Sequence, residues 1–252
     1  MLVFNCKLYN QLQLWKYVLQ WPNLHKALNV SRHTMKTLIL LLLLFFSLTN
    51  PTFAQEDFHL SNDSDTAFWY AYKNNYARQF KLGFIENDTN AYSFRFWSSG
   101  LVIKIVGKTN QNFGEIIRFV EAYPKKKNKK VFTKHYPITS SQASKIRHLI
   151  DSLQIETLPS DKNIKGWDHG FDGIEYFTEF KRNGLYTFKN YWTPTAQDTL
   201  KEAKLFQNFV SSLSNILDLK NNGKLFQDDI PFDSWTYPGS ASAILRVKQK
   251  PK

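Results

Sequence analysis

Alternating hydrophobic and polar positions dominate the chain between residues 80 and 135, a pattern typical of half-buried β-strands. The alternating rows occupy residues 80–84, 92–96, 101–105, 115–123 and 131–135. Short polar turns separate them, so we expect consecutive strands to pair in an antiparallel meander. The aromatic stretch at residues 68–76 shows no decisive period, and the pattern leaves its structure open.

Two later stretches have a helical period. The first helix is expected to begin at Thr139, which can cap it, with Gln142 three positions later completing a capping box. Its inward face is expected to carry Ile146, Leu149, Ile150 and Leu153. The second helix is expected to begin after Pro194, with Thr195 as N-cap, and to end at the Asn-Asn-Gly sequence of residues 221–223.

A β-hairpin is predicted between the two helices, because Asn183-Gly184 is a strong signal for a type I′ turn. Residues 174–182 then pair with residues 185–192, with Arg182 opposite Leu185. That register puts one set of side chains on one face (Ile174, Tyr176, Phe180, Leu185, Tyr191) and a second set on the other (Glu175, Phe177, Glu179, Tyr186, Phe188, Trp192). Strands in series followed by separate helices indicate an α+β fold, an antiparallel meander sheet of about six to eight strands with two main helices packed on it.

Residues 35–54 have the anatomy of a secretory signal peptide. Met35 and Lys36 begin a short basic region, an apolar run follows, and Thr52 and Ala54 place small residues before a cleavage site. The apolar run is much shorter than the roughly 20 residues that cross a bilayer. Cleavage after Ala54 would leave residues 55–252 as a single mature α+β domain, periplasmic or secreted.

Residues 1–34 precede this signal, and two interpretations are open. They can be an upstream extension in front of a true start at Met35. Alternatively, they form a basic cytoplasmic tail, and residues 35–54 are an uncleaved signal anchor in the inner membrane. The length of the apolar run and the fit of the cleavage site favour the first interpretation.

Charge limits the classes of binding partner, and cysteine content limits the covalent cross-links of the mature domain. The chain has 33 Lys and Arg residues and 21 Asp and Glu residues, and residues 1–54 hold five of the basic ones and none of the acidic ones. The mature part is therefore basic, which favours anionic lipid or polysaccharide, and export argues against nucleic acid. The single cysteine, Cys6, lies upstream of the signal, so the mature domain has no disulfide.

The densest polar stretch lies at residues 166–175 and contains Asp168, His169, Asp172 and Glu175. An EF-hand-like calcium loop would use Asp168, Asp172, Gly173 and Glu179. However, a glycine at the third loop position and a strand after the loop disfavour it. The other histidines of the mature part, His59, His135 and His148, show no ligand spacing, and we predict no metal and no cofactor.

The same four polar residues could serve a hydrolase, which we keep as the alternative function. Glu175 and Glu179 share a strand face, but their Cα atoms would be about 13 Å apart. Paired glycosidase carboxylates lie about 5–9.5 Å apart, so this pair fits poorly unless Asp168 or Asp172 folds back. His169 has no accompanying G-x-S-x-G nucleophile motif.

The preferred hypothesis is a non-enzymatic binding domain that acts through residues 166–192 on an envelope protein or polysaccharide. Trp167, Trp192 and Glu179 are the binding candidates, because aromatic rings offer flat contact area beside polar groups. A second contact with an anionic surface is expected for a basic run between two strands, unless it is simply a solvated hairpin tip. This run consists of Lys125, Lys126, Lys127, Lys129 and Lys130.

Residues 166–179 read G-W-x-x-G-x-D-G-x-x-Y-x-x-E, and residues 190–197 read N-Y-W-T-P-x-A-Q. Together with a following E-A-x-x-x-Q-N-F-V helix, they resemble a group of secreted bacterial proteins without an assigned activity. The resemblance implies that residues 55–252 form one domain, and it brings no catalytic residue or cofactor.

Gly173 is expected at positive φ, because the chain must pass from loop to strand within one or two residues. Asp172 is expected to close this turn by accepting hydrogen bonds from the backbone amides that follow it.

Overall fold

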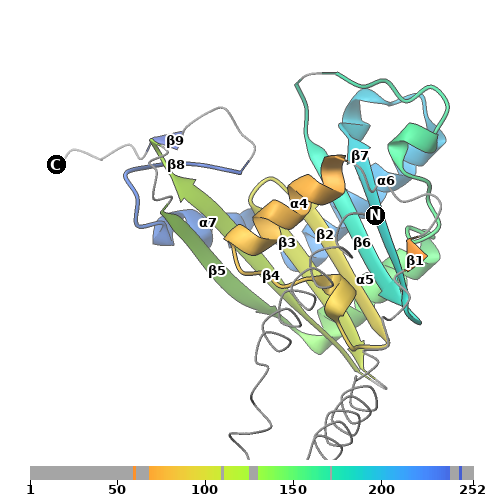
Figure 1. The fold of residues 1–252 in the computed structure, drawn as a ribbon, viewed down its shortest axis with the longest axis horizontal. Helices are drawn as coiled ribbons and strands as arrows, with labels where there is room; N and C mark the ends of the chain where they lie inside the picture. The colour runs from red at the N-terminus through yellow and green to blue at the C-terminus, as the bar shows by residue number, and fades with distance from the viewer. Residues whose placement is uncertain are drawn as a thin grey trace, which may run out of the picture. The chain divides into compact units, whose positions relative to one another are not determined.

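The computed structural model describes residues 68–108, 111–124, 130–170 and 172–238, together with the backbone of 59–60 and residues 244–245 (Figure 1). The predicted upstream extension, the signal peptide and four of the five lysines of the basic run lie outside the described residues. The chain divides into two compact units, Met1–Gln55 and Glu56–Lys252, and all of the described residues belong to the second. Within the described ranges, no helix is both long enough and apolar enough to cross a bilayer.

Nine strands of the described part of the chain form one sheet. They are β1 (His59–Leu60), β2 (Tyr92–Ser98), β3 (Leu101–Lys108), β4 (Gln111–Ala122), β5 (Val131–Ile138), β6 (Glu175–Arg182), β7 (Leu185–Trp192), β8 (Ser234–Thr236) and β9 (Ile244–Leu245). Their order is β1-β7-β6-β2-β3-β4-β8-β9, and β5 also pairs with β4. Strands β2 to β9 pair antiparallel, and β1 pairs parallel with β7.

Among the described residues, four α-helices and three 3₁₀ turns accompany the sheet. The helices are α4 (Phe68–Gln79), α5 (Ser140–Ser152), α6 (Lys201–Leu217) and α7 (Leu219–Asp229). The 3₁₀ turns are η1 (Ile85–Asn87), η2 (Asp161–Asn163) and η3 (Pro194–Ala196). The predicted α+β class, with a meander from β2 to β5 and two main helices on the sheet, is confirmed.

The two faces of the sheet are covered by different helices (Figure 1). Alternate residues of β2 and β6, such as Phe94 and Phe180, pack against Phe206 and Phe209 of α6 in the larger core, which α5 completes. The intervening residues, such as Trp97 and Phe177, point to the opposite face and pack under α4. This period-2 alternation gives the sheet a hydrophobic core on each side.

The hairpin β6–β7 has the predicted register, with Arg182 opposite Leu185. Asn183 and Gly184 both have positive φ, 52° and 79°, as a type I′ turn requires. The capping box of α5 is also confirmed. The amide of Gln142 donates to the Thr139 hydroxyl at 3.2 Å, and the amide of Thr139 donates to the Gln142 side chain at 3.1 Å.

The predicted strand at residues 80–84 is wrong. The amide of Phe80 donates to the carbonyl of Tyr76, and the amide of Leu82 donates to the carbonyl of Ala77, so this segment closes the end of α4. Lys81 and Gly83 have positive φ, 55° and 66°, which is incompatible with an extended strand.

Both predicted ends of the second helix are also wrong. Residues 194–196 form η3, and α6 begins at Lys201. The helix ends where Asp218 adopts a left-handed conformation, and α7 then continues through the Asn-Asn-Gly sequence. Arg118 holds the first turn of α7 around Gly223, because its Nη2 donates to the Leu219 carbonyl at 2.8 Å and its Nε donates to Asn222 Oδ1 at 2.5 Å. Tertiary contact with Arg118 therefore overrides the usual helix-stop signal.

Candidate functional site: an aromatic cavity above a buried ion pair

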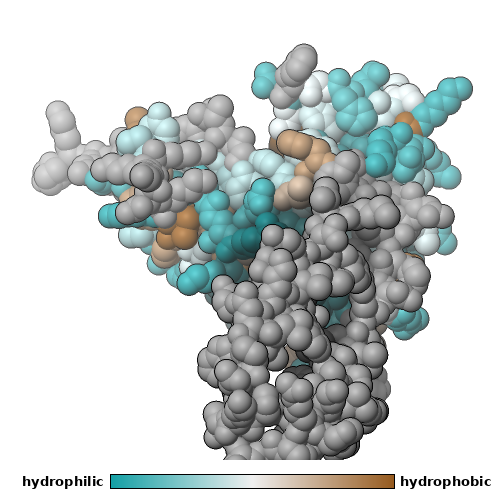
Figure 2. Space-filling model, viewed as in Figure 1, coloured by the Kyte–Doolittle hydropathy of each residue, from teal (hydrophilic) through white to brown (hydrophobic). Residues whose placement is uncertain are grey.

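Helix α4 presents an aromatic face to the sheet. Trp69, Tyr72, Lys73 and Tyr76 follow one another at i, i+3, i+4 and i+7, so their side chains lie on one side of the helix. Lys73 is buried, and the three rings are half-buried. Figure 2 shows hydrophobic atoms at the surface above the N-terminal end of this helix, where Phe68 is 66 % exposed.

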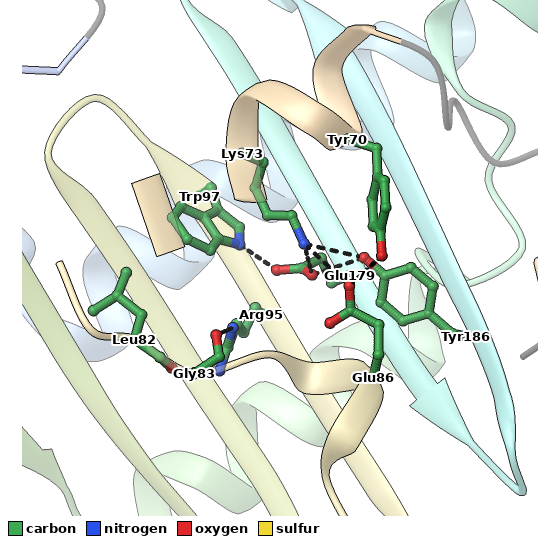
Figure 3. A network of polar contacts seen from close by, with 9 residues as sticks. All are labelled: Tyr70, Lys73, Leu82, Gly83, Glu86, Arg95, Trp97, Glu179 and Tyr186. Carbon is green, nitrogen blue, oxygen red and sulfur yellow. Dashed lines mark hydrogen bonds and ion pairs between the residues drawn. The ribbon is translucent and has the colours of Figure 1, made fainter. Parts of the chain in front are cut away.

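Beneath α4, a fully buried carboxylate anchors the helix to the sheet (Figure 3). The Lys73 ammonium donates to Glu179 Oε1 at 2.6 Å, and the Tyr186 hydroxyl donates to the same oxygen at 2.8 Å. Trp97 Nε1 donates to the other oxygen, Oε2. Each carboxylate oxygen therefore has a donor, as a buried charge requires.

Two further charged groups extend this network. The Arg95 guanidinium, only 2 % exposed, donates to the carbonyls of Leu82 and Gly83, which follow α4. Glu86 accepts from the Tyr70 hydroxyl and lies 3.6 Å from the Lys73 ammonium. Helix α4 and the segment after it are thus held to the sheet by charged hydrogen bonds as well as by packing.

The pKa values of Glu179 and Tyr70 in this network are shifted by burial and by neighbouring groups. Burial alone would raise the pKa of Glu179, but the charges of Lys73 and Arg95 outweigh it and hold that pKa below its ordinary value. Burial and the hydrogen bond to Glu86 raise the pKa of Tyr70, so its phenol stays protonated and acts as a donor. The Glu179 carboxylate is therefore charged at neutral pH.

A cavity of about 370 Å³ lies between the aromatic face of α4 and the end of the sheet. Trp97, Phe119 and Phe177 are its buried aromatic residues, and half-buried rings of α4 and β7 complete the lining. Trp69, Tyr72, Tyr76 and Trp192 supply those half-buried rings. Polar groups on the lining include Lys73, His169, Glu175 and the Ser98–Ser99 turn.

His169 reaches the cavity from the loop before β6 and pairs with a buried carboxylate. Its Nε2 lies 3.2 Å from Asp161 Oδ2, and Asp161 is 1 % exposed. The same oxygen accepts from the backbone amide of Trp192 at 2.7 Å. Burial raises the pKa of Asp161, and the Trp192 amide and His169 only partly offset that effect.

The Trp192 ring explains two glycines of the loop. A Cβ on Gly170 would lie 2.9 Å from this ring, and a Cβ on Gly173 would lie 2.6 Å from Trp192 Nε1 and 2.1 Å from Thr193 Oγ1. Gly173 is not among the positive-φ glycines, so the expectation for its φ is wrong. It is required because the loop backbone runs directly against Trp192 and Thr193.

The expected role of Asp172 is also wrong. Its side chain is exposed and has no hydrogen bond or ion pair to the described residues. The amide of Ile174, which it was expected to bind, instead donates to Thr193 Oγ1 at 2.9 Å. The loop is closed from β7 rather than by its own aspartate.

The structure brings together some of the sequence candidates and separates others. His169, Glu175 and Trp192 line the cavity, whereas Asp168 and Asp172 do not. The Asp168 backbone is clamped by Gln197, which accepts from its amide at 3.1 Å and donates to its carbonyl at 2.8 Å. The four candidate hydrolase residues therefore do not converge on one point.

The remaining two binding candidates lie behind the cavity. Trp167 is 6 % exposed and packs in the larger core, with its Nε1 donating to the Trp192 carbonyl at 2.9 Å. Glu179 is fully buried and binds Lys73 and Trp97, which themselves line the cavity. Both residues contact side chains that line the cavity, but neither of them lines it.

Sequence reasoning missed Asp161 and the whole contribution of α4. Trp69, Tyr72 and Tyr76 do show helical spacing, but Lys73 interrupts their face and hides it as an amphipathic signal. Asp161 lies 8 residues before His169 on a different element, and no local pattern links the two. Among the described residues, no group of three His, Cys, Asp or Glu side chains is arranged to hold a metal ion.

Comparisons of the chain with protein-family models, with curated proteins and with solved structures gave no match. The resemblance seen in residues 166–197 therefore stays a prediction, and the function has to be argued from the site.

Proposed function

We propose that this protein is an exported, non-enzymatic binding domain that takes part of an envelope component into the aromatic cavity. The observation that carries the proposal is the lining of that cavity, in which seven aromatic side chains surround about 370 Å³. Ligand sites are typically concave, mainly apolar and aromatic, and marked by a few polar groups. Here His169 and Glu175 are such groups.

Export is the second part of the proposal and rests on the signal-like residues 35–54. Cleavage after Ala54 would release a protein beginning at Gln55, which mass spectrometry of the exported protein would detect. Peptides from residues 1–34 in cells would favour the alternative, a chain that keeps its extension and stays anchored in the inner membrane.

The binding proposal is tested with one wall variant and one matched control. Trp69→Ala removes a half-buried ring from the cavity, and Phe113→Ala removes a 43 % exposed ring that does not line it. Intrinsic tryptophan fluorescence is followed while saccharides, short peptides and organic cations are titrated. Saturable binding that Trp69→Ala weakens and Phe113→Ala preserves is expected. Equal binding by both variants, or no binding by any probe, would refute the proposal.

A hydrolase remains the second candidate, supported by the Asp161–His169 pair. A buried carboxylate that holds an imidazole beside a cavity can orient it as a general base. On this hypothesis, the purified protein would turn over a substrate, and His169→Gln would abolish turnover while leaving binding intact. Asp161→Asn would reduce turnover and shift its pH profile, which a purely structural role of Asp161 would not do.

A further inference from the structure

Strand β5 is an edge of the sheet. It pairs with β4 alone, and β3 and β8 both pair with the other side of β4. Figure 1 shows β5 at the outer margin of the sheet, and none of the described strands lies beyond it. No residue of β5 lines the aromatic cavity, so an inference from this edge is independent of the proposed function.

The backbone of β5 alternates between groups that bond to β4 and groups that face away from the sheet. The amide of Ala122 donates to the carbonyl of Lys130 at 2.9 Å, and this bond fixes the phase of the antiparallel ladder. Even-numbered residues of β5 therefore bond to β4, whereas the N–H and C=O groups of Val131, Thr133 and His135 point outward. None of these outward groups bonds to another described residue.

The outward groups are complementary to a second copy of themselves. Pro137, the next outward residue, has no N–H, so the ladder that both donates and accepts ends at His135. A two-fold axis at Thr133 would place Val131 opposite His135 of a second copy, and the two Thr133 residues opposite each other. Each opposed pair in such a ladder exchanges two hydrogen bonds, so every outward N–H and C=O group of these three residues would be satisfied.

The charges on β5 favour a second copy over a charged peptide. Lys134 forms an ion pair with Asp229, and His135 Nδ1 lies 2.8 Å from Glu115 Oε2, all within one chain. The two basic side chains of the strand are therefore already matched, and neither selects an acidic partner.

Lysine positions also select the place of the axis. With the axis at Thr133, Lys134 lies opposite Phe132 of the second copy. An axis at Lys134 would oppose the two Lys134 side chains, and an axis at Phe132 would oppose Lys134 to Lys130. Like charges directly opposite each other on paired strands are destabilising, so both neighbouring positions are disfavoured.

We propose that this protein forms a homodimer through antiparallel pairing of two β5 strands about Thr133, which joins the two sheets into one. The contact is isologous, because the same strand of each copy supplies both its donors and its acceptors.

Sedimentation of the purified protein over a concentration series tests the association, and a mass twice that of one chain is expected at high concentration. Thr133→Pro removes an outward N–H and no bond to β4, as Pro137 does on the same strand. Both bonds of the central pair are lost, so the dissociation constant of the dimer should rise about tenfold or more. Thr133→Ala is the matched control and should leave that constant unchanged, because it keeps the backbone N–H.

Opposite charges at position 133 test the axis and do not depend on how the strand tolerates proline. Thr133→Lys and Thr133→Glu should each weaken self-association, because the axis brings position 133 of both copies together. An equimolar mixture of the two variants should associate again as a heterodimer. Amide hydrogen exchange gives a further readout. The amides of Val131, Thr133 and His135 should become protected as concentration rises, whereas those of Phe132 and Lys134 should be protected at every concentration.

Several results would overturn the inference. One is a protein that stays monomeric throughout the concentration series. Another is a dimer that Thr133→Pro leaves equally stable, or a pair of charged variants that do not associate when mixed. Protection of the three outward amides in the monomer would also overturn it, because another segment of the same chain would then cover the edge. None of these results bears on ligand binding in the cavity, which is measured separately.

Discussion

The buried pair Lys73–Glu179 permits a prediction about stability. The sign of the stability change caused by Glu179→Gln should depend on whether Lys73 is present. Both side chains have no exposed surface, and they belong to α4 and β6, 106 residues apart. Lys73→Met keeps the length of the side chain and removes its charge. It leaves the Glu179 carboxylate buried, with Tyr186 and Trp97 as its remaining direct donors.

Removing one partner of a buried ion pair typically costs about 3–5 kcal/mol, because the other charge stays uncompensated. We expect Lys73→Met to fall in the lower half of that range, since Arg95 also favours the charged form of Glu179. Glu179→Gln alone should be destabilising as well, because it leaves the Lys73 ammonium buried. In the Lys73→Met background, the same substitution removes the orphaned charge and should raise stability by about 1–3 kcal/mol.

Urea unfolding of the four proteins at pH 7, extrapolated linearly to water, gives the required free energies. The reversal of sign for Glu179→Gln is the diagnostic result. If Glu179→Gln destabilises the Lys73→Met protein as much as it destabilises the wild type, the two side chains are not coupled and our account of the anchor is wrong.

Acid titration supplies an independent check. The pKa of Glu179 lies below its ordinary value of 4.5, so its stabilisation is present above pH 4.5 and is lost as the pH falls through the folded-state pKa. Without Lys73, burial dominates and raises that pKa. The stability deficit of Lys73→Met should therefore shrink as the pH is lowered from 7 towards 5, and a constant deficit would contradict this reasoning.

Three further substitutions test the loop and the helix. Gly173→Ala should lower the unfolding free energy by about 1–3 kcal/mol, because its methyl group would overlap the Trp192 ring. Asp172→Ala should change it by less than about 0.5 kcal/mol, since that side chain is exposed, and a larger loss would restore a structural role for Asp172. Thr139→Ala should lower the unfolding free energy by about 1 kcal/mol through loss of the capping box, whereas the control Ser141→Ala in the same turn should leave it unchanged. Thermal unfolding of each variant beside the wild type measures these differences.

The sequence determined the features that depend on neighbouring residues. The hairpin register follows from Asn183-Gly184, because a type I′ turn and a period of two leave one pairing for the flanking strands. The cap of α5 follows from Thr139 and Gln142, which are three positions apart on one turn. Such features require no knowledge of the rest of the chain.

Only the tertiary structure decided the features in which distant residues meet. The aromatic face of α4 includes Lys73, which is unfavourable in a buried position until Glu179 lies beside it. A glycine is needed at position 173 because a Cβ there would collide with Trp192 of β7, whereas the φ of Gly173 does not itself require a glycine. The cavity joins α4, residues of β2, β4, β6 and β7, and the His169 loop, and no local pattern encodes that meeting because it arises from long-range packing.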